Sequence, residues 1–208
     1  MKLSLAPLYI FTGTLLYSKT SFAHHVMDGD MPVTFFQGLV SGLGHPVIDM
    51  THFAFICGIG ILCGVTRKSY LLPLPFLFGA IGGIGIQMNF FEFQMPEVAL
   101  AGTLILLAAL LLYVKKISFP VIVPVFLVCG TLHGYAYGEG ILGAEQGPIA
   151  AYLLGLMIIQ YGIATIFIRF SHLVQAQEKP AMNQIFAGLF GMAELGLMAL
   201  AAISPDAF

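Results

Sequence analysis

Residues 33–65 read VTFFQGLVSGLGHPVIDMTHFAFICGIGILCGV and contain one charged side chain, that of Asp49. A transmembrane helix needs about 20 consecutive apolar residues, so this segment is too long for one simple span and too short for two. His45-Pro46 lies near its middle. Proline lacks an N–H and disfavours helix at the residue before it. The sequence therefore predicts a short helix to about Gly44, a break, and a new helix beginning near Pro46.

The rest of the chain is equally apolar. Of its 208 residues, 59% are apolar and 9% are charged, whereas a soluble domain carries about 25% charged residues. Further apolar segments follow at about 70–90, 96–114, 118–137, 148–169 and 182–203. This pattern predicts an all-α membrane protein, a six-span helical bundle in the lipid bilayer whose first span is broken at His45-Pro46. No basic patch is present, which argues against nucleic acid as a partner.

The N-terminus has the pattern of a secretory signal. Lys2 supplies a basic start, Leu3 to Tyr17 is apolar, and Ser21-Phe22-Ala23 places small residues at a cleavage site. We predict that residues 1–23 are a cleavable signal peptide, with an uncleaved anchor helix as the alternative. Cleavage leaves residues 24–208 as a single transmembrane domain.

Charges in the connecting segments predict the orientation. One side collects every basic residue of the mature chain, namely Arg67, Lys68, Lys115, Lys116, Arg169 and Lys179. The other side collects Asp28, Asp30, Glu92, Glu145 and Asp206. Basic loops lie on the cytoplasmic side of a membrane. We therefore expect a multi-pass protein of the bacterial inner (cell) membrane with the mature N-terminus and the C-terminus outside.

Ionisable residues inside apolar segments call for a functional reason because they are costly in a bilayer. His45, Asp49 and His52 follow one another at spacings of i, i+4 and i+7. On one helix these positions share a face, where two imidazoles and a carboxylate offer ligands to one cation. Two alternatives remain open: His45 caps the helix that begins at Pro46, or Asp49 pairs with a single histidine.

A second group lies at the outer end of the fourth span, in the segment from His133 to Glu139. We expect His133 and Glu139 to be further metal ligands, with a hydrogen-bonded packing motif as the alternative. Glu97 opens the third span on the same side. It is either a ligand or a first-turn acid that complements the helix dipole.

The predicted mature N-terminus offers a third group, with His24, His25 and Asp28 beside a free α-amine. These groups are candidates for metal capture outside the membrane, and a disordered polar tail is the alternative. Imidazole with carboxylate suits nickel, cobalt, zinc or iron(II). Cys57, Cys63 and Cys129 lie within apolar segments, and we expect them to be small buried hydrophobic residues rather than ligands or a disulfide framework.

The sequence resembles the HupE/UreJ family of nickel and cobalt permeases. The N-terminal match includes Ala23-His24-His25, Phe36-x-Gly38 and Gly42-Leu43-Gly44-His45-Pro46. It continues at Pro96-Glu97, at Leu132-His133-Gly134-Tyr135-Ala136-Tyr137-Gly138-Glu139, and at Gly155 and Gln160-Tyr161-Gly162. The resemblance implies a small secondary permease for Ni²⁺ or Co²⁺ that serves hydrogenase, urease or cobalamin maturation.

The chain departs from the family pattern at four positions. The family reads H-P-x-x-G-x-D-H, whereas this chain reads His45-Pro46-Val47-Ile48-Asp49-Met50-Thr51-His52. Asp49 replaces the glycine of the pattern and Thr51 replaces its aspartate, so a carboxylate is kept but lies two residues earlier in the chain. Tyr137 and Gln160 stand where many members carry histidine.

The functional hypothesis is therefore a permease, not an enzyme, without a prosthetic group. Its cargo is nickel or cobalt, with zinc and iron(II) as alternatives. The rival hypotheses are a membrane-embedded metal-binding accessory protein and an intramembrane zinc hydrolase, which would hold a metal-activated water. Homo-oligomerisation, the coupling ion and the choice of metal are left open by the sequence.

Overall fold

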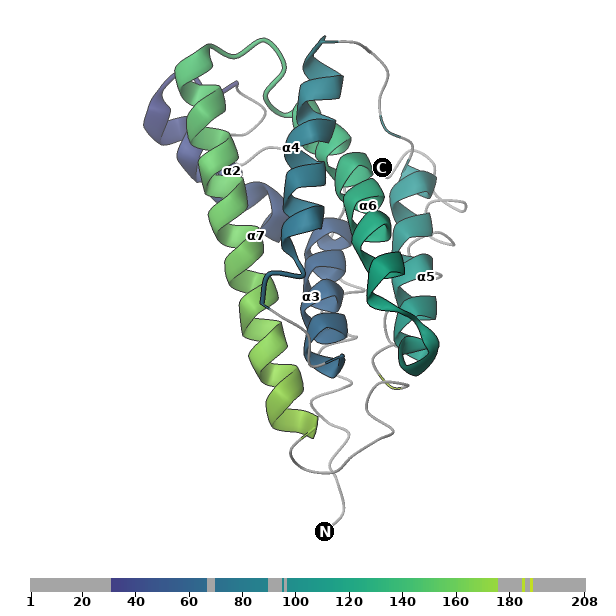
Figure 1. The fold of residues 1–208 in the computed structure, drawn as a ribbon. Helices are drawn as coiled ribbons and strands as arrows, with labels where there is room; N and C mark the ends of the chain where they lie inside the picture. The colour runs from purple at the N-terminus through teal and green to yellow at the C-terminus, as the bar shows by residue number, and fades with distance from the viewer. Residues whose placement is uncertain are drawn as a thin grey trace, which may run out of the picture.

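The computed structural model describes residues 31–66, 70–89, 95, 97–175, 185 and 188. Its secondary structure in this part of the chain is entirely helical (Figure 1). The predicted signal peptide at 1–23 and the predicted last span at 182–203 lie outside these residues, apart from 185 and 188. The elements are α2 (Phe35–Ile48), α3 (Met50–Val65), α4 (Leu74–Asn89), α5 (Glu97–Leu112), a 3-10 turn η2 (Val114–Lys116), α6 (Phe119–Glu139) and α7 (Gln146–Gln175).

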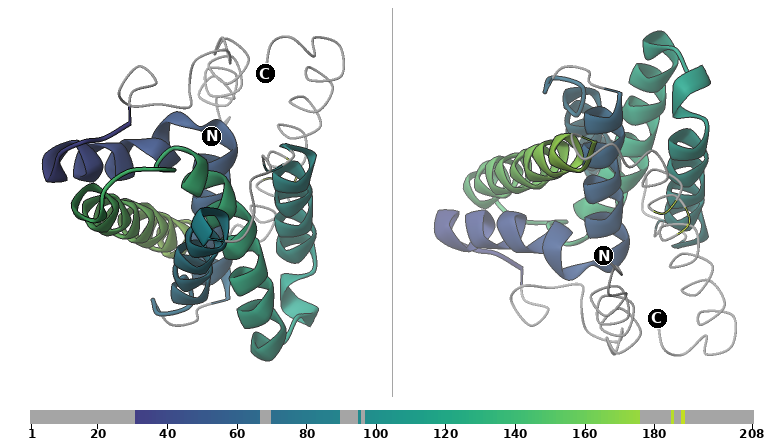
Figure 2. Two further views of the ribbon diagram at one scale, coloured as in Figure 1. Left: turned by 90° about the horizontal axis from the view of Figure 1, so that it is seen from above. Right: turned by 90° about the horizontal axis from the view of Figure 1, so that it is seen from below.

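The first apolar segment forms two helices that meet at an angle of 80°. Seen from below in Figure 2, α2 and α3 make an L. The predicted break is confirmed, but it lies at Asp49 rather than at His45-Pro46. Helix α2 continues through Pro46, and the Asp49 N–H still donates to the His45 carbonyl oxygen at 3.2 Å.

The Asp49 side chain explains where the break falls. Its Oδ1 atom accepts hydrogen bonds from the backbone N–H groups of Thr51 (2.8 Å) and His52 (3.0 Å). A side chain that satisfies these first N–H groups is a helix N-cap. Asp49 thus starts α3, while Pro46 removes only one hydrogen bond near the end of α2.

Two described helices, Pro120–Glu139 and Gln146–Val174, are long and apolar enough to cross a bilayer, and the bent α2–α3 pair makes a third if it is one broken span. Helices α4 and α5 are apolar but shorter. At 1.5 Å per residue, a 16-residue helix such as α4 covers about 24 Å. The expected all-α membrane bundle with a broken first span is therefore confirmed over the described residues.

Glycines let α4 and α6 pack side by side (Figure 1). A Cβ atom on Gly79 would overlap the Leu127 carbonyl oxygen, and one on Gly83 would overlap the Thr131 carbonyl oxygen. Close backbone approach through small residues is the usual way in which helices associate in membranes. By contrast, Gly82 and Gly85 face no heavy atom within 4 Å in the described structure.

Helix α7 packs along both arms of the L. Gly42 of α2 approaches the Tyr152 carbonyl oxygen, and Gly60 of α3 approaches the Ala164 carbonyl oxygen. These contacts hold α2 and α3 against one long helix on either side of the Asp49 junction. The three cysteines are free and buried, as predicted.

Candidate metal centre

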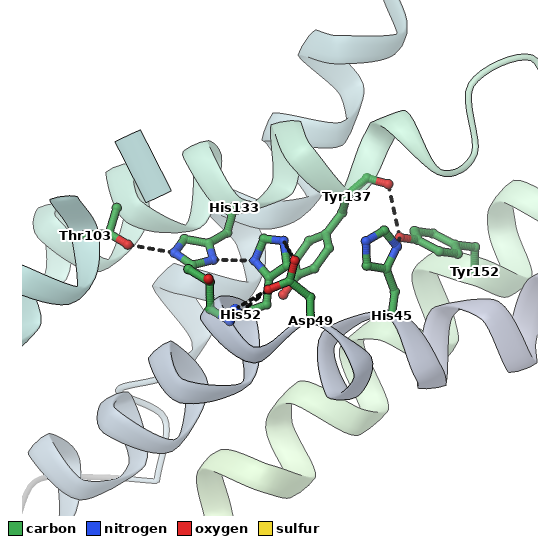
Figure 3. A network of polar contacts seen from close by, with 8 residues as sticks. His45, Asp49, His52, Thr103, His133, Tyr137 and Tyr152 are labelled. Carbon is green, nitrogen blue, oxygen red and sulfur yellow. Dashed lines mark hydrogen bonds and ion pairs between the residues drawn. The ribbon is translucent and has the colours of Figure 1, made fainter. Parts of the chain in front are cut away.

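The 80° bend and the packing of α3 on the rest of the bundle bring three histidines together from three helices. His45 belongs to α2, His52 to α3 and His133 to α6, and their exposed fractions are 7%, 2% and 0%. The ring centroids of His45 and His52 lie 6.0 Å apart, and those of His52 and His133 lie 4.8 Å apart. Figure 3 shows the three rings in a row between Thr103 and Tyr152.

The reason predicted for this convergence is wrong in one respect. His45, Asp49 and His52 do not share a face of one helix, because α2 ends at Ile48 and α3 begins at Met50. The alternative in which His45 caps a helix starting at Pro46 is also wrong, since α2 runs through that residue. The bend, not the helical repeat, places His45 near His52.

His52 and His133 are joined directly. The distance between their Nδ1 atoms is 2.6 Å, and the Nε2 atom of His133 lies 2.8 Å from the Thr103 hydroxyl oxygen on α5. Thr103 donates its own proton to the Leu100 carbonyl oxygen at 2.6 Å, so it accepts from the Nε2–H of His133. A neutral His133 then has a lone pair on Nδ1, which accepts the Nδ1–H of His52. Both ring nitrogens of His133 are thus hydrogen-bonded inside the protein.

A second hydrogen bond orients His45. Its Nδ1 atom lies 2.9 Å from the Tyr152 hydroxyl oxygen on α7. Tyr152 donates to the Tyr137 carbonyl oxygen at 3.1 Å, so its oxygen accepts the Nδ1–H of His45. In both His45 and His52 the proton is therefore on Nδ1, and Nε2 is the nitrogen with a lone pair. Metal-binding histidines are oriented in this way by a partner on the other ring nitrogen.

The carboxylate of Asp49 lies next to His52. Its Oδ2 atom is 3.9 Å from His52 Nε2, and the side chain is 18% exposed. Two ligands bound to one metal at about 2.0–2.1 Å lie roughly 2.8–3.4 Å apart for angles between 90° and 109°. The distance of 3.9 Å between Asp49 Oδ2 and His52 Nε2 is thus slightly longer than the distance between two ligands on one metal. The described residues contain no group of three or more His, Cys, Asp or Glu side chains at metal-binding spacing.

The remaining predicted ligands are placed differently. Glu139 Oε1 accepts the Met95 N–H at 2.8 Å and so ties the end of α6 to a residue just before α5. Glu97 is the first residue of α5, and its side chain lies outside the described structure. His24, His25 and Asp28 also lie outside it.

Sequence reasoning missed Thr103 and Tyr152. A threonine in an apolar helix commonly bonds to the carbonyl three or four residues earlier, so Thr103 gave no distinctive signal. Tyr152 lies in an apolar run, where an aromatic ring is usually core. Their importance comes from contacts with residues 30 and 107 positions away, which spacing along one helix does not reveal.

The fold and the site define a multi-pass helical membrane protein with a buried imidazole–carboxylate cluster. The family described as "HupE / UreJ protein" matches residues 12–199. The chain therefore belongs to the HupE/UreJ family.

One curated relative is Protein HupE from Rhizobium leguminosarum bv. viciae. It is 25% identical over 139 residues, which cover 64% of this chain and 73% of that protein. No solved structure matches the chain.

Proposed function

We propose that this protein is a permease that carries a divalent transition metal, nickel or cobalt, across the bacterial inner membrane. One observation carries the proposal: His45 of α2, Asp49 at the α2–α3 junction, His52 of α3 and His133 of α6 lie together within an apolar bundle. Ionisable side chains at such positions mark ion pathways in membrane proteins. Membership of the HupE/UreJ family supports the same function.

The cation would bind to the Nε2 atoms of His45 and His52 and to Oδ2 of Asp49. Two imidazoles on one metal at about 2.1 Å have ring centroids roughly 4.6–5.3 Å apart for angles between 90° and 109° at the metal, so the observed 6.0 Å is slightly wider than in a closed site. Small side-chain movements close the 3.9 Å gap between His52 and Asp49 onto the cation. Imidazole with carboxylate favours nickel, cobalt, zinc or iron(II) over softer copper(I).

His133 acts in two ways in this proposal. While bonded to His52 it fixes the tautomer that presents His52 Nε2 to the cation. It becomes a ligand itself only when the His52–His133 bond breaks, which would move the cation from the Asp49 side toward α6. The hinge for such a step is the 80° junction at Asp49, and broken helices commonly form substrate sites in transporters.

The inside-negative membrane potential would drive entry, since it is worth roughly 2.3 kcal/mol per charge per 100 mV. We further propose that the mature N-terminus and the C-terminus lie outside and that His24, His25 and Asp28 collect metal there. Delivery to hydrogenase, urease or cobalamin maturation would follow uptake.

Uptake of radioactive Co²⁺ and Ni²⁺ by cells that express the protein tests the proposal. We expect His45→Ala and His52→Ala to abolish uptake at equal membrane abundance. His172→Ala is the matched control, because His172 also lies in a helix but its ring contacts Tyr70, away from the cluster. Unchanged uptake in both cluster variants would refute the assignment of the transport site to this cluster, and no uptake by the wild type would refute the permease. Metal binding without uptake by the wild-type protein would instead favour an accessory role.

A further inference from the structure

Two buried polar side chains beside the cluster have no role in the proposed transport site. Tyr137 of α6 and Gln160 of α7 are 0% and 1% exposed. Neither the Tyr137 hydroxyl nor either amide atom of Gln160 has a hydrogen-bond partner in the described structure. Buried polar groups are nearly always paired, so this pair calls for an explanation.

The two side chains lie next to the histidines. The Tyr137 ring centroid is 4.2 Å from that of His52 and 5.2 Å from that of His45. The Gln160 amide lies beside the Tyr137 hydroxyl, and Asp49 is near enough to act on Tyr137 electrostatically. The Tyr137 hydroxyl on α6 and the Gln160 amide on α7 therefore lie next to the proposed cation position.

A direct bond between the two side chains would not satisfy them. A phenol has one donor and an amide has two donors and an acceptor oxygen, so one Tyr137–Gln160 bond leaves most of the amide unpaired. Tyr152 provides the contrast within the same protein. It is equally buried, at 0% exposed, yet its hydroxyl is bonded to His45 and to the Tyr137 carbonyl oxygen.

We propose that Tyr137 and Gln160 bind water inside the bundle, and that a divalent cation at the neighbouring cluster keeps some of this water as ligands. A buried water is held by two to four polar partners, and the Tyr137 hydroxyl and the two Gln160 amide atoms are three buried polar atoms that lack other partners in the described structure. The part of this inference that concerns the cation rests on the proposed function, whereas the water site does not.

Radiolytic hydroxyl-radical labelling of the purified, detergent-solubilised chain tests the water site, since radicals made from bound water modify the side chain next to it. We expect Tyr137 to be labelled several-fold more than Tyr152, although both are fully buried. Gln160→Leu should reduce labelling of Tyr137, while Thr165→Val should leave it unchanged. Thr165 is the matched control because its buried hydroxyl oxygen also lacks a hydrogen-bond partner. Equal, low labelling of the two tyrosines would overturn the proposal.

Uptake of Co²⁺ tests the role of the water in transport. Tyr137→Phe keeps the ring that packs on His52 and removes only the hydroxyl, so we expect several-fold slower uptake at unchanged abundance. Thr165→Val should transport like the wild type. Normal uptake by Tyr137→Phe would refute the inference that the transported cation keeps this water as ligands. If the wild type itself takes up no metal, the proposed function and the cation part fail together, and the labelling result still decides the water site.

Discussion

The Nδ1 atoms of His52 and His133 lie 2.6 Å apart and join α3 to α6 across 81 residues of sequence. Because the Thr103 hydroxyl accepts the other ring proton of His133, this contact fixes the proton on His52 Nδ1. The nitrogen that faces Asp49 is therefore the one that carries a lone pair. A hydrogen-bonded pair of this kind sets the direction in which a buried histidine binds a cation.

Thr103→Val removes the acceptor of His133 and leaves a buried N–H unpaired. We expect a loss of about 1–3 kcal/mol in the free energy of unfolding and slower Co²⁺ uptake, because the His133 tautomer is no longer fixed. Thermal unfolding in detergent and uptake measure the two effects. Thr131→Val is the control, since the Thr131 hydroxyl makes an exposed hydrogen bond to the Leu127 carbonyl oxygen. Equal behaviour of the two variants would contradict the role assigned to Thr103.

Asp49 has two roles that two substitutions separate. Asparagine is as good an N-cap as aspartate, so Asp49→Asn should keep the start of α3 and the melting temperature while losing the negative charge. We expect its Co²⁺ affinity and uptake to fall strongly. Asp49→Ala should lose the cap as well, at a further cost of about 1 kcal/mol in stability. If Asp49→Asn binds Co²⁺ like the wild type, the carboxylate is a cap and not a ligand.

Tyr152→Phe removes the hydroxyl that accepts the His45 Nδ1–H. The loss of an orienting partner typically lowers metal affinity by about 10–100-fold, and we expect a decrease in this range for Co²⁺. Equilibrium dialysis of the purified protein measures it. Tyr161→Phe, on the same helix, is the control and should bind like the wild type. An unchanged affinity in Tyr152→Phe would show that His45 needs no such partner.

Gly82 and Gly83 are neighbours with opposite surroundings. A Cβ on Gly83 overlaps the backbone of α6, whereas none on Gly82 meets an atom within 4 Å in the described structure. Gly83→Ala should therefore force α4 and α6 apart and lower the melting temperature. Gly82→Ala should be neutral or stabilising by up to about 1 kcal/mol, as expected for alanine in a helix. Similar melting temperatures for the two variants would contradict the close packing described for α4 and α6.

The sequence predicted the helices well because apolar length is a strong signal in membrane proteins. The expected segment 118–137 corresponds to α6 at Phe119–Glu139, and 70–90 corresponds to α4 at Leu74–Asn89. The break was misplaced because two local preferences compete. Pro46 only weakens α2, whereas the Asp49 side chain actively starts α3.

Residue type was a better guide to the candidate site than residue spacing. His45, Asp49, His52 and His133 were chosen because ionisable groups are costly in apolar segments, and they do lie together. Their arrangement depends on tertiary contacts such as the Thr103–His133 bond. A one-dimensional pattern holds no information on such contacts. Whether these residues bind metal stays a prediction.

X-ray absorption spectroscopy of the Co²⁺-loaded protein tests the central claim most directly. A background with His24→Ala and His25→Ala removes the histidines of the expected outer capture group. In this background we predict one bound cobalt per chain with imidazole and oxygen ligands, and loss of an imidazole in His52→Ala but not in His172→Ala. Cobalt that keeps the same number of imidazole ligands in His45→Ala and His52→Ala would contradict the account.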